Sequence, residues 1–224
     1  MPENAERTIG FYTRNEELTN TLTHAAGVLL AIVGLFLLLQ RTSSTGDIWK
    51  IVTCAIFGAS LIISYTFSML YHGMRNKKWK YWMRVIDHAG VYFLIAGTYT
   101  PFTLIVIGGA LGWALFTVVW VIAIIGITLK FVKYEIPRSA SAVPYLVMGW
   151  ISLFAFKPLL DFAETSGWGG LILLTSGGVL YSVGTIFYSW KGLLFNHAIW
   201  HIFVLAGSIT HYFAVLLYVI PFTS

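Results

Sequence analysis

Long apolar stretches alternate with short polar segments along almost the whole chain. A helix needs about 20 mostly apolar residues to cross a bilayer, and a window of that length finds seven candidates, the fifth of them the shortest. The predicted spans cover residues 20–40, 49–72, 86–107, 110–131, 141–158, 168–190 and 197–220. The short loops leave no room for a soluble domain. We therefore predict an all-α integral membrane bundle of seven transmembrane helices, with a short cytoplasmic N-terminal segment, 1–19, before a transmembrane domain, 20–224.

The composition supports a membrane protein. Hydrophobic residues make up 58% of the 224 residues and charged residues 10%, whereas about 25% of the residues in soluble domains are charged. Cys54 is the single cysteine and lies in an apolar stretch, so the chain has no disulfide framework. The first 20 residues lack the basic-then-apolar order of a secretory signal. We expect a multi-pass protein without a cleaved leader.

The positions of the basic residues predict the orientation of the bundle. Cytoplasmic loops carry an excess of Lys and Arg, and if the spans alternate, most basic residues fall on one side. That side holds Arg7, Arg14, Arg75, Lys77, Lys78, Lys80, Arg84, Lys130, Lys133, Arg138 and Lys191, against Arg41, Lys50 and Lys157 on the other. We therefore expect the N-terminus in the cytoplasm and the C-terminus outside. The net charge of +5 then faces anionic lipid headgroups, which makes membrane lipids the expected partners and disfavours nucleic acid.

A few ionisable side chains fall within or beside the predicted spans, where they are costly and therefore candidates for function. His72 ends the second span, and Ser68 lies four residues earlier on the same helix face. His197 and His201 share one face at the start of the seventh span, and Asp87 opens the third. In the expected orientation these positions converge on one layer, with Ser68 about 6 Å deeper than His72.

Histidines at positions i and i+4 can chelate a metal ion, and a third histidine from a facing helix completes a set of three ligands. Nitrogen ligands without a suitable cysteine favour zinc, although imidazole also accepts copper, iron and nickel. Three protein ligands leave a fourth position open for water, as in catalytic zinc sites. We predict a zinc site at His72, His197 and His201, with Asp87 orienting a histidine or the water. Hydrogen bonding between the histidines is the alternative.

The remaining polar residues have structural interpretations. We interpret His24 as a satisfied histidine at the membrane interface and His88 as a contact to a loop or headgroup. His211 lies about 15 Å deeper than His201 by helical rise and is expected to line the bundle interior. The polar residues before the first span, Glu17 and Asn20, are typical of a capped helix start with an acidic first turn.

Several of these residues lie in motifs that resemble a known family. The motifs are ELTNTLTH (17–24), SMLYH (68–72), DHAG (87–90), AGTYTP (96–101), MGW (148–150) and NHAIWH (196–201). Together they are similar to the hemolysin III family of bacterial membrane proteins, which is related to the progestin and adipoQ receptors, including the adiponectin receptors. The resemblance covers nearly the whole chain and implies a location in the bacterial plasma (inner) membrane.

The resemblance implies roles for five residues. In that superfamily the histidines that correspond to His72, His197 and His201 bind zinc, and the aspartate at the position of Asp87 holds the water on the zinc ion. The serine at the position of Ser68 lies beside the metal, where it hydrogen-bonds the water or a reacting carbonyl. All five residue types are present here.

Three functions follow as hypotheses. Because the wider grouping includes alkaline ceramidases, the resemblance implies a zinc-dependent hydrolase acting on a lipid amide or ester from the inner leaflet, with Asp87 and Ser68 as the catalytic residues. The first alternative is a non-enzymatic protein of membrane-lipid and fluidity homeostasis, or a lipid sensor, with structural zinc. The second is a cytolytic pore, which has less support because seven apolar helices with few charges offer no polar lumen.

Overall fold

The structure is a computed structural model that describes residues 12–132, 138–190 and 192–223. Within these ranges all regular structure is helical, and seven helices are long and apolar enough to cross a membrane. The α-helices are Arg14–Ser43 (α2), Ile48–Gly73 (α3), Lys77–Pro101 (α4), Gly109–Val132 (α5), Arg138–Gly149 (α6), Phe156–Ser166 (α7), Trp168–Ser189 (α8) and Asn196–Ala214 (α9). Shorter helical turns extend or join them at Phe102–Ile107 (η1), Ile151–Ala155 (η2) and Val215–Val219 (η3). The predicted all-α bundle of seven spans is confirmed.

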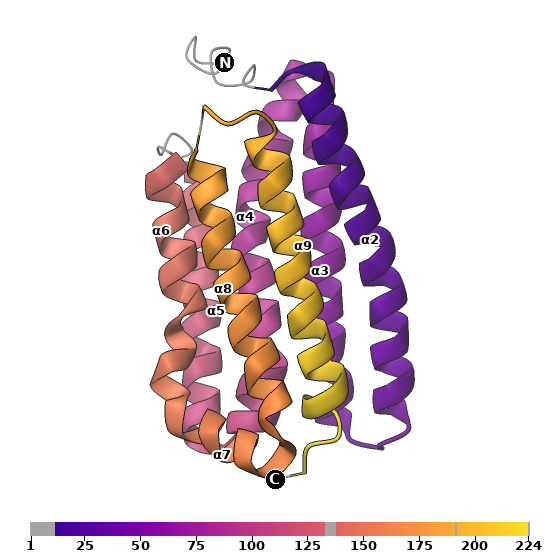
Figure 1. The fold of residues 1–224 in the computed structure, drawn as a ribbon, viewed down its shortest axis with the longest axis vertical. Helices are drawn as coiled ribbons and strands as arrows, with labels where there is room; N and C mark the ends of the chain where they lie inside the picture. The colour runs from indigo at the N-terminus through magenta and orange to yellow at the C-terminus, as the bar shows by residue number, and fades with distance from the viewer. Residues whose placement is uncertain (1–11, 133–137, 191, 224) are drawn as a thin grey trace.

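The spanning helices lie side by side in one bundle (Figure 1). In this bundle α9 packs against both α8 and α2, and α3 packs between α2 and α4. Successive spans run in opposite directions, so α2, α4 and α9 begin at the end of the bundle where α3 terminates, the top of Figure 1. The alternation therefore brings the polar ends of these four helices together.

Local sequence signals set the helix boundaries. Asp47 accepts hydrogen bonds from the backbone N–H groups of Trp49 and Lys50 at the start of α3, and Asn76 caps the start of α4 in the same way. These caps satisfy backbone donors that have no partner inside the helix. Gly108 and Gly109 join η1 to α5 with φ angles of 59° and 52°, a conformation that glycine adopts without steric cost.

The surface of the bundle suits a lipid environment. Large apolar side chains point outward, and among them Leu29 is 67% exposed, Phe36 65% and Phe154 82%. Monomeric soluble proteins rarely expose apolar surface on this scale, whereas contact with lipid tails removes it from water.

Two predicted boundaries differ from the structure. The first span begins at Arg14 rather than residue 20, so the polar residues before the apolar stretch are already helical. The fifth span covers Ala142–Ser166 rather than ending at 158, and η2 interrupts it. The hydropathy window missed the second half of this span because the charged residues Lys157, Asp161 and Glu164, exposed on α7, lower the mean hydropathy there.

Candidate metal centre

Three histidines meet at the end of the bundle where α3 terminates and α9 begins. His72 lies in the last turn of α3, while His197 and His201 lie one turn apart in the first turns of α9. One nitrogen atom from each of the three rings lies within 4.8 Å of the corresponding nitrogens of the other two. All three side chains are buried. The sequence prediction that these residues converge is thus confirmed in its geometry.

The ring nitrogens of His72 fit a metal ligand. Its Nδ1 lies 2.6 Å from Glu17 Oε2, whereas its Nε2 is buried and has no hydrogen-bond partner among the described residues. Buried polar atoms almost always have a hydrogen-bond partner, so a metal ion bound to this Nε2 atom would supply the partner that it lacks. The Nδ1 atom of His201 also has a contact from α2, because it lies 3.0 Å from Thr23 Oγ1. The donor set fits a zinc ion, for which imidazole nitrogen is a preferred ligand.

Aromatic rings surround the cluster. Tyr12 lies over His197 with ring centroids 5.2 Å apart and over His72 at 5.9 Å, and Tyr188 packs against His197 at 5.8 Å. These rings pack against the histidines at this end of the bundle and contribute to their burial.

Asp87 and Ser68 line a pocket that also includes His197 and His201. Ser68 is buried on α3, one turn from His72. The Asp87 carboxylate on α4 lies 3.5 Å from the Nδ1 atom of His88. The structure therefore brings the predicted catalytic residues and the two α9 histidines to one cavity. Their catalytic roles remain predictions.

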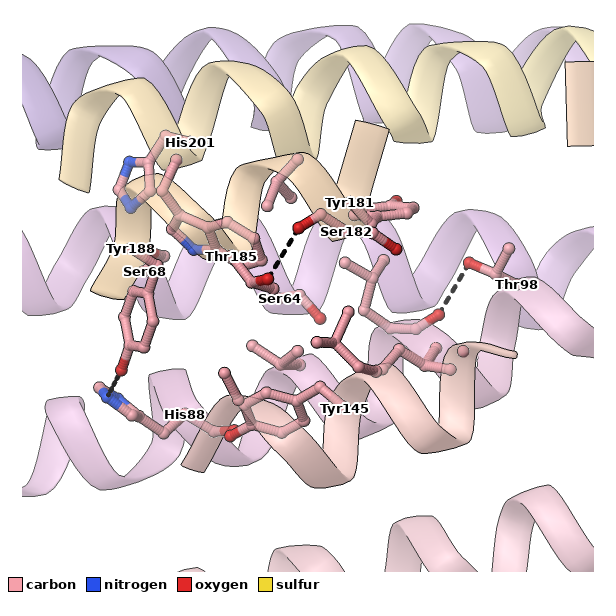
Figure 2. Close-up of a pocket in the computed structure, with 18 of the residues that line it drawn as sticks. Ser64, Ser68, His88, Thr98, Tyr145, Tyr181, Ser182, Thr185, Tyr188 and His201 are labelled. Atoms are coloured by element: carbon pink, nitrogen blue, oxygen red, sulfur yellow. Dashed lines mark hydrogen bonds between the residues drawn. The ribbon is translucent and has the colours of Figure 1, made fainter. Parts of the chain in front are cut away.

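The cavity has a volume of about 130 Å³ and extends from the histidines into the bundle between α3, α4, α6, α8 and α9. Figure 2 shows His201 and Ser68 near one end of the pocket and Thr98 towards the other. Its walls are mainly apolar, with tyrosine, serine and threonine hydroxyl groups at intervals. Ligand sites typically combine apolar walls with a few placed polar groups.

His24 corrects an expectation drawn from the sequence. It is buried at 6% exposure rather than satisfied at the interface, and neither ring nitrogen has a hydrogen-bond partner in the described parts of the chain. Its ring stacks on that of His201. The spacing along α2 could not reveal this burial, because it depends on α9 packing beside α2.

The predictions for the other two histidines, His88 and His211, have different outcomes. His88 was expected at a loop or headgroup, but its Nε2 lies 3.3 Å from the Tyr188 hydroxyl on α8 (Figure 2), and its Nδ1 lies 2.8 Å from the Arg84 carbonyl. His211 lies in the bundle interior as predicted, with Nε2 2.9 Å from the Leu174 carbonyl.

Sequence reasoning missed the contacts that α2 makes with the site. Glu17 lies in an acidic first turn, as predicted, but its carboxylate also contacts both His72 and Lys80. The N-cap residue is Thr13, whose hydroxyl accepts from the Glu16 N–H while the Glu16 carboxylate accepts from the Thr13 N–H. A signal was available, since positions 17, 20 and 24 follow the i, i+3, i+7 spacing of one helix face.

Comparison with known proteins agrees with the motifs. A family model described as haemolysin-III related matches residues 12–212. The hemolysin-3 homolog of Bacillus subtilis (strain 168) is 48% identical over 217 residues, which cover 95% of this chain and 100% of the relative. Hemolysin-3 of Bacillus cereus is 44% identical over 209 residues, covering 93% and 94%.

A more distant relative is the human monocyte to macrophage differentiation factor. It is 31% identical over 211 residues, covering 91% of this chain and 84% of the relative. This similarity supports the relation to the progestin and adipoQ receptor superfamily. With matches that span nearly the whole sequence and seven apolar helices, the chain belongs to the haemolysin-III-related family of multi-pass bacterial membrane proteins.

Proposed function

We propose that the protein is a zinc-dependent hydrolase that cleaves an amide or ester bond of a membrane lipid. The observation that carries this proposal is the meeting of three buried histidines, with ligand nitrogens within 4.8 Å of one another, beside a largely apolar pocket. His72, His197 and His201 would hold the ion. A zinc ion held by three protein ligands polarises a carbonyl group and lowers the pKa of its bound water towards about 7.

The residues of the pocket have separate tasks in this reaction. Asp87 accepts a proton from the attacking water while the water oxygen bonds to the carbonyl carbon. Asp87 then returns a proton to the amine or alcohol as the carbon–heteroatom bond breaks. Ser68 donates a hydrogen bond to the carbonyl oxygen, where negative charge develops. The apolar walls hold a lipid chain and exclude water. The products are a fatty carboxylic acid and the freed amine or alcohol.

The location of the substrate follows from the proposed orientation. Lys77 and Lys78 at the start of α4 and Lys130 at the end of α5 belong to the bundle end that holds the histidines. A cytoplasmic N-terminus would put this end at the inner leaflet, so a lipid would enter from that leaflet. Tags at the N-terminus and at the C-terminus, probed in intact cells and in inverted vesicles, test the orientation.

The test of the enzyme uses the detergent-purified full chain, elemental analysis for metal, and a screen for fatty acid released from lipid amides and esters. Wild type should contain about one zinc per chain and release fatty acid. Asp87→Asn should retain zinc but lose activity, whereas His201→Ala should lose both. Asp161→Asn is the matched control, because it makes the same change as Asp87→Asn at an exposed position on α7. Normal turnover by Asp87→Asn and His201→Ala would refute the enzymatic role.

A structural or sensing zinc is the second candidate, and the contacts between helices favour it. The histidine layer joins α2, α3 and α9, because Glu17 contacts His72 and Thr23 contacts His201. A metal ion at this point would clamp α3 to α9. This candidate predicts that zinc removal lowers stability while no lipid turnover accompanies zinc binding.

Cytolysis is a third candidate, favoured by the name of the Bacillus cereus relative, Hemolysin-3. A direct lytic role predicts release of haemoglobin from erythrocytes by the purified protein. If lysis depends on hydrolysis instead, Asp87→Asn should abolish it together with fatty acid release.

A further inference from the structure

Two side chains of α2 contact the Nδ1 atoms of two candidate ligands. Glu17 lies against His72, and Thr23 lies against His201, in each case at Nδ1. The helix itself contributes none of the three clustered histidines. The first turns of α2 therefore lie beside the site and supply none of these three ligands.

The Glu17 contact determines which nitrogen of His72 carries the proton. A carboxylate can only accept a hydrogen bond, so its approach to 2.6 Å from Nδ1 places the proton on that nitrogen. The Asn20 amide nitrogen lies farther from the same atom, at 3.4 Å. The other carboxylate oxygen accepts from Lys80 Nζ at 2.9 Å, which fixes the position of the Glu17 side chain. The lone pair of His72 is then left on Nε2, the buried nitrogen without a partner.

Thr23 imposes the same choice on His201. The Thr23 hydroxyl donates its one hydrogen to the Asn20 carbonyl at 2.9 Å, so towards His201 Nδ1 at 3.0 Å it can only accept. The proton of His201 therefore also lies on Nδ1, and the lone pair lies on Nε2. Two unrelated side chains of α2 thus set the same tautomer in two ligands.

A third contact ties α2 to the start of α9. Glu16 Oε1 accepts a hydrogen bond from the backbone N–H of Phe195 at 3.1 Å. Phe195 has a φ of 57°, which is strained for a residue with a side chain. The bond holds the turn that precedes His197.

From these contacts we infer that Glu17 and Thr23 are the positioning residues of the metal centre, which make His72 and His201 bind zinc through Nε2. This inference rests on the metal site of the proposed function but not on hydrolysis. Partners that orient a ligating histidine typically contribute 10–100-fold to metal affinity.

The test measures zinc affinity of the full-length protein in detergent by competition with a chromophoric chelator. Glu17→Gln and Thr23→Val should each bind zinc about 10–100-fold more weakly than wild type. Glu164→Gln and Thr19→Val are the matched controls, because Glu164 is exposed on α7 and the Thr19 hydroxyl donates to Asn15 of its own helix. Thr23→Ser keeps the hydroxyl and should restore near wild-type affinity.

A purely structural role makes a different prediction. It would lower the unfolding temperature of the metal-free variants and would not weaken zinc binding by the folded protein. Wild-type zinc affinity in both Glu17→Gln and Thr23→Val overturns the inference, and equal weakening in Thr23→Ser and Thr23→Val does the same for Thr23. If Glu17→Gln does not fold, the zinc affinities of Thr23→Ser and Thr23→Val test the inference on their own.

The outcomes also separate this inference from the proposed function. Zinc binding that weakens as predicted, without any lipid turnover, supports the positioning residues and refutes the hydrolase. Failure of the wild-type protein to bind zinc overturns both.

Discussion

The imidazole rings of His24 and His201 are stacked, with centroids 3.6 Å apart and 8° between their planes. The lone pair of a ring nitrogen lies in the plane of the ring, so two parallel rings direct their lone pairs into separate planes. An ion in the plane of the His201 ring is therefore out of the plane of the His24 ring. The stacking separates His24 from the ligands although it lies in the same polar layer.

This geometry predicts that His24 is dispensable for metal binding. His24→Phe keeps a ring against His201 and Tyr65 and should retain about one zinc per chain. His24→Ala removes the ring contacts and should lower the free energy of unfolding by about 2–5 kcal/mol, as large-to-small core changes do. Elemental analysis and thermal unfolding in detergent measure the two effects. Loss of zinc from a folded His24→Phe protein would instead make His24 a ligand.

Lys50 stabilises the opposite end of the bundle. Its buried ammonium group donates to the carbonyls of Ile220 at 2.8 Å and Phe222 at 2.7 Å. Lys50→Met leaves both carbonyls without this donor and should lower the free energy of unfolding by about 2 kcal/mol. Zinc affinity should not change, because the site lies at the other end of α3.

Lys157→Met is the control for this change, because Lys157 is exposed and its ion pair with Asp161 on the same helix contributes only a few tenths of a kcal/mol. Equal stability of the Lys50 and Lys157 variants would mean that water or another donor replaces the lysine.

Gly97 allows the close approach of α4 to α3. A Cβ atom at this position would lie 2.2 Å from Ser60 Oγ and 2.4 Å from Ser60 Cβ. The Ser60 Cβ cannot move without its helix, so Gly97→Ala should lower the free energy of unfolding by about 1–3 kcal/mol. Ser60→Gly removes both clashing atoms, and the double variant should recover much of this loss in a double-mutant cycle.

Gly178→Ala is the matched control, because the nearest atom to its added Cβ would be 3.6 Å away on Trp150. If Gly97→Ala is as stable as Gly178→Ala, α3 and α4 can separate without loss of packing.

The meeting of His72, His197 and His201 was predictable because it depends on regular features. Hydropathy gives the spans, alternation gives their directions, and the i, i+4 spacing puts His197 and His201 on one face. These facts place the three residues at one depth, and the polar character of that layer favours their contact.

The surroundings of the site were less predictable because they depend on contacts between distant parts of the chain. Glu17 lies before the apolar stretch, so its position in the sequence resembles an ordinary helix start. Its contact with His72 requires α2 to begin at Arg14 and to pack on α3. In the same way, the pairing of His88 with Tyr188 joins residues on α4 and α8 that have no shared motif.

Zinc removal should destabilise the protein, because the ligands come from two helices that separate on unfolding. An ion that binds only the folded state adds RT ln(1 + [Zn]/Kd), which is about 2.7 kcal/mol when free zinc is 100 times Kd. A chelator should therefore lower the unfolding temperature of wild type, and added zinc should restore it. The His72→Ala/His197→Ala/His201→Ala variant should show neither response. If the wild-type unfolding temperature stays constant while elemental analysis records complete loss of zinc, the ion does not clamp α3 to α9, and the structural candidate fails while the catalytic one stands.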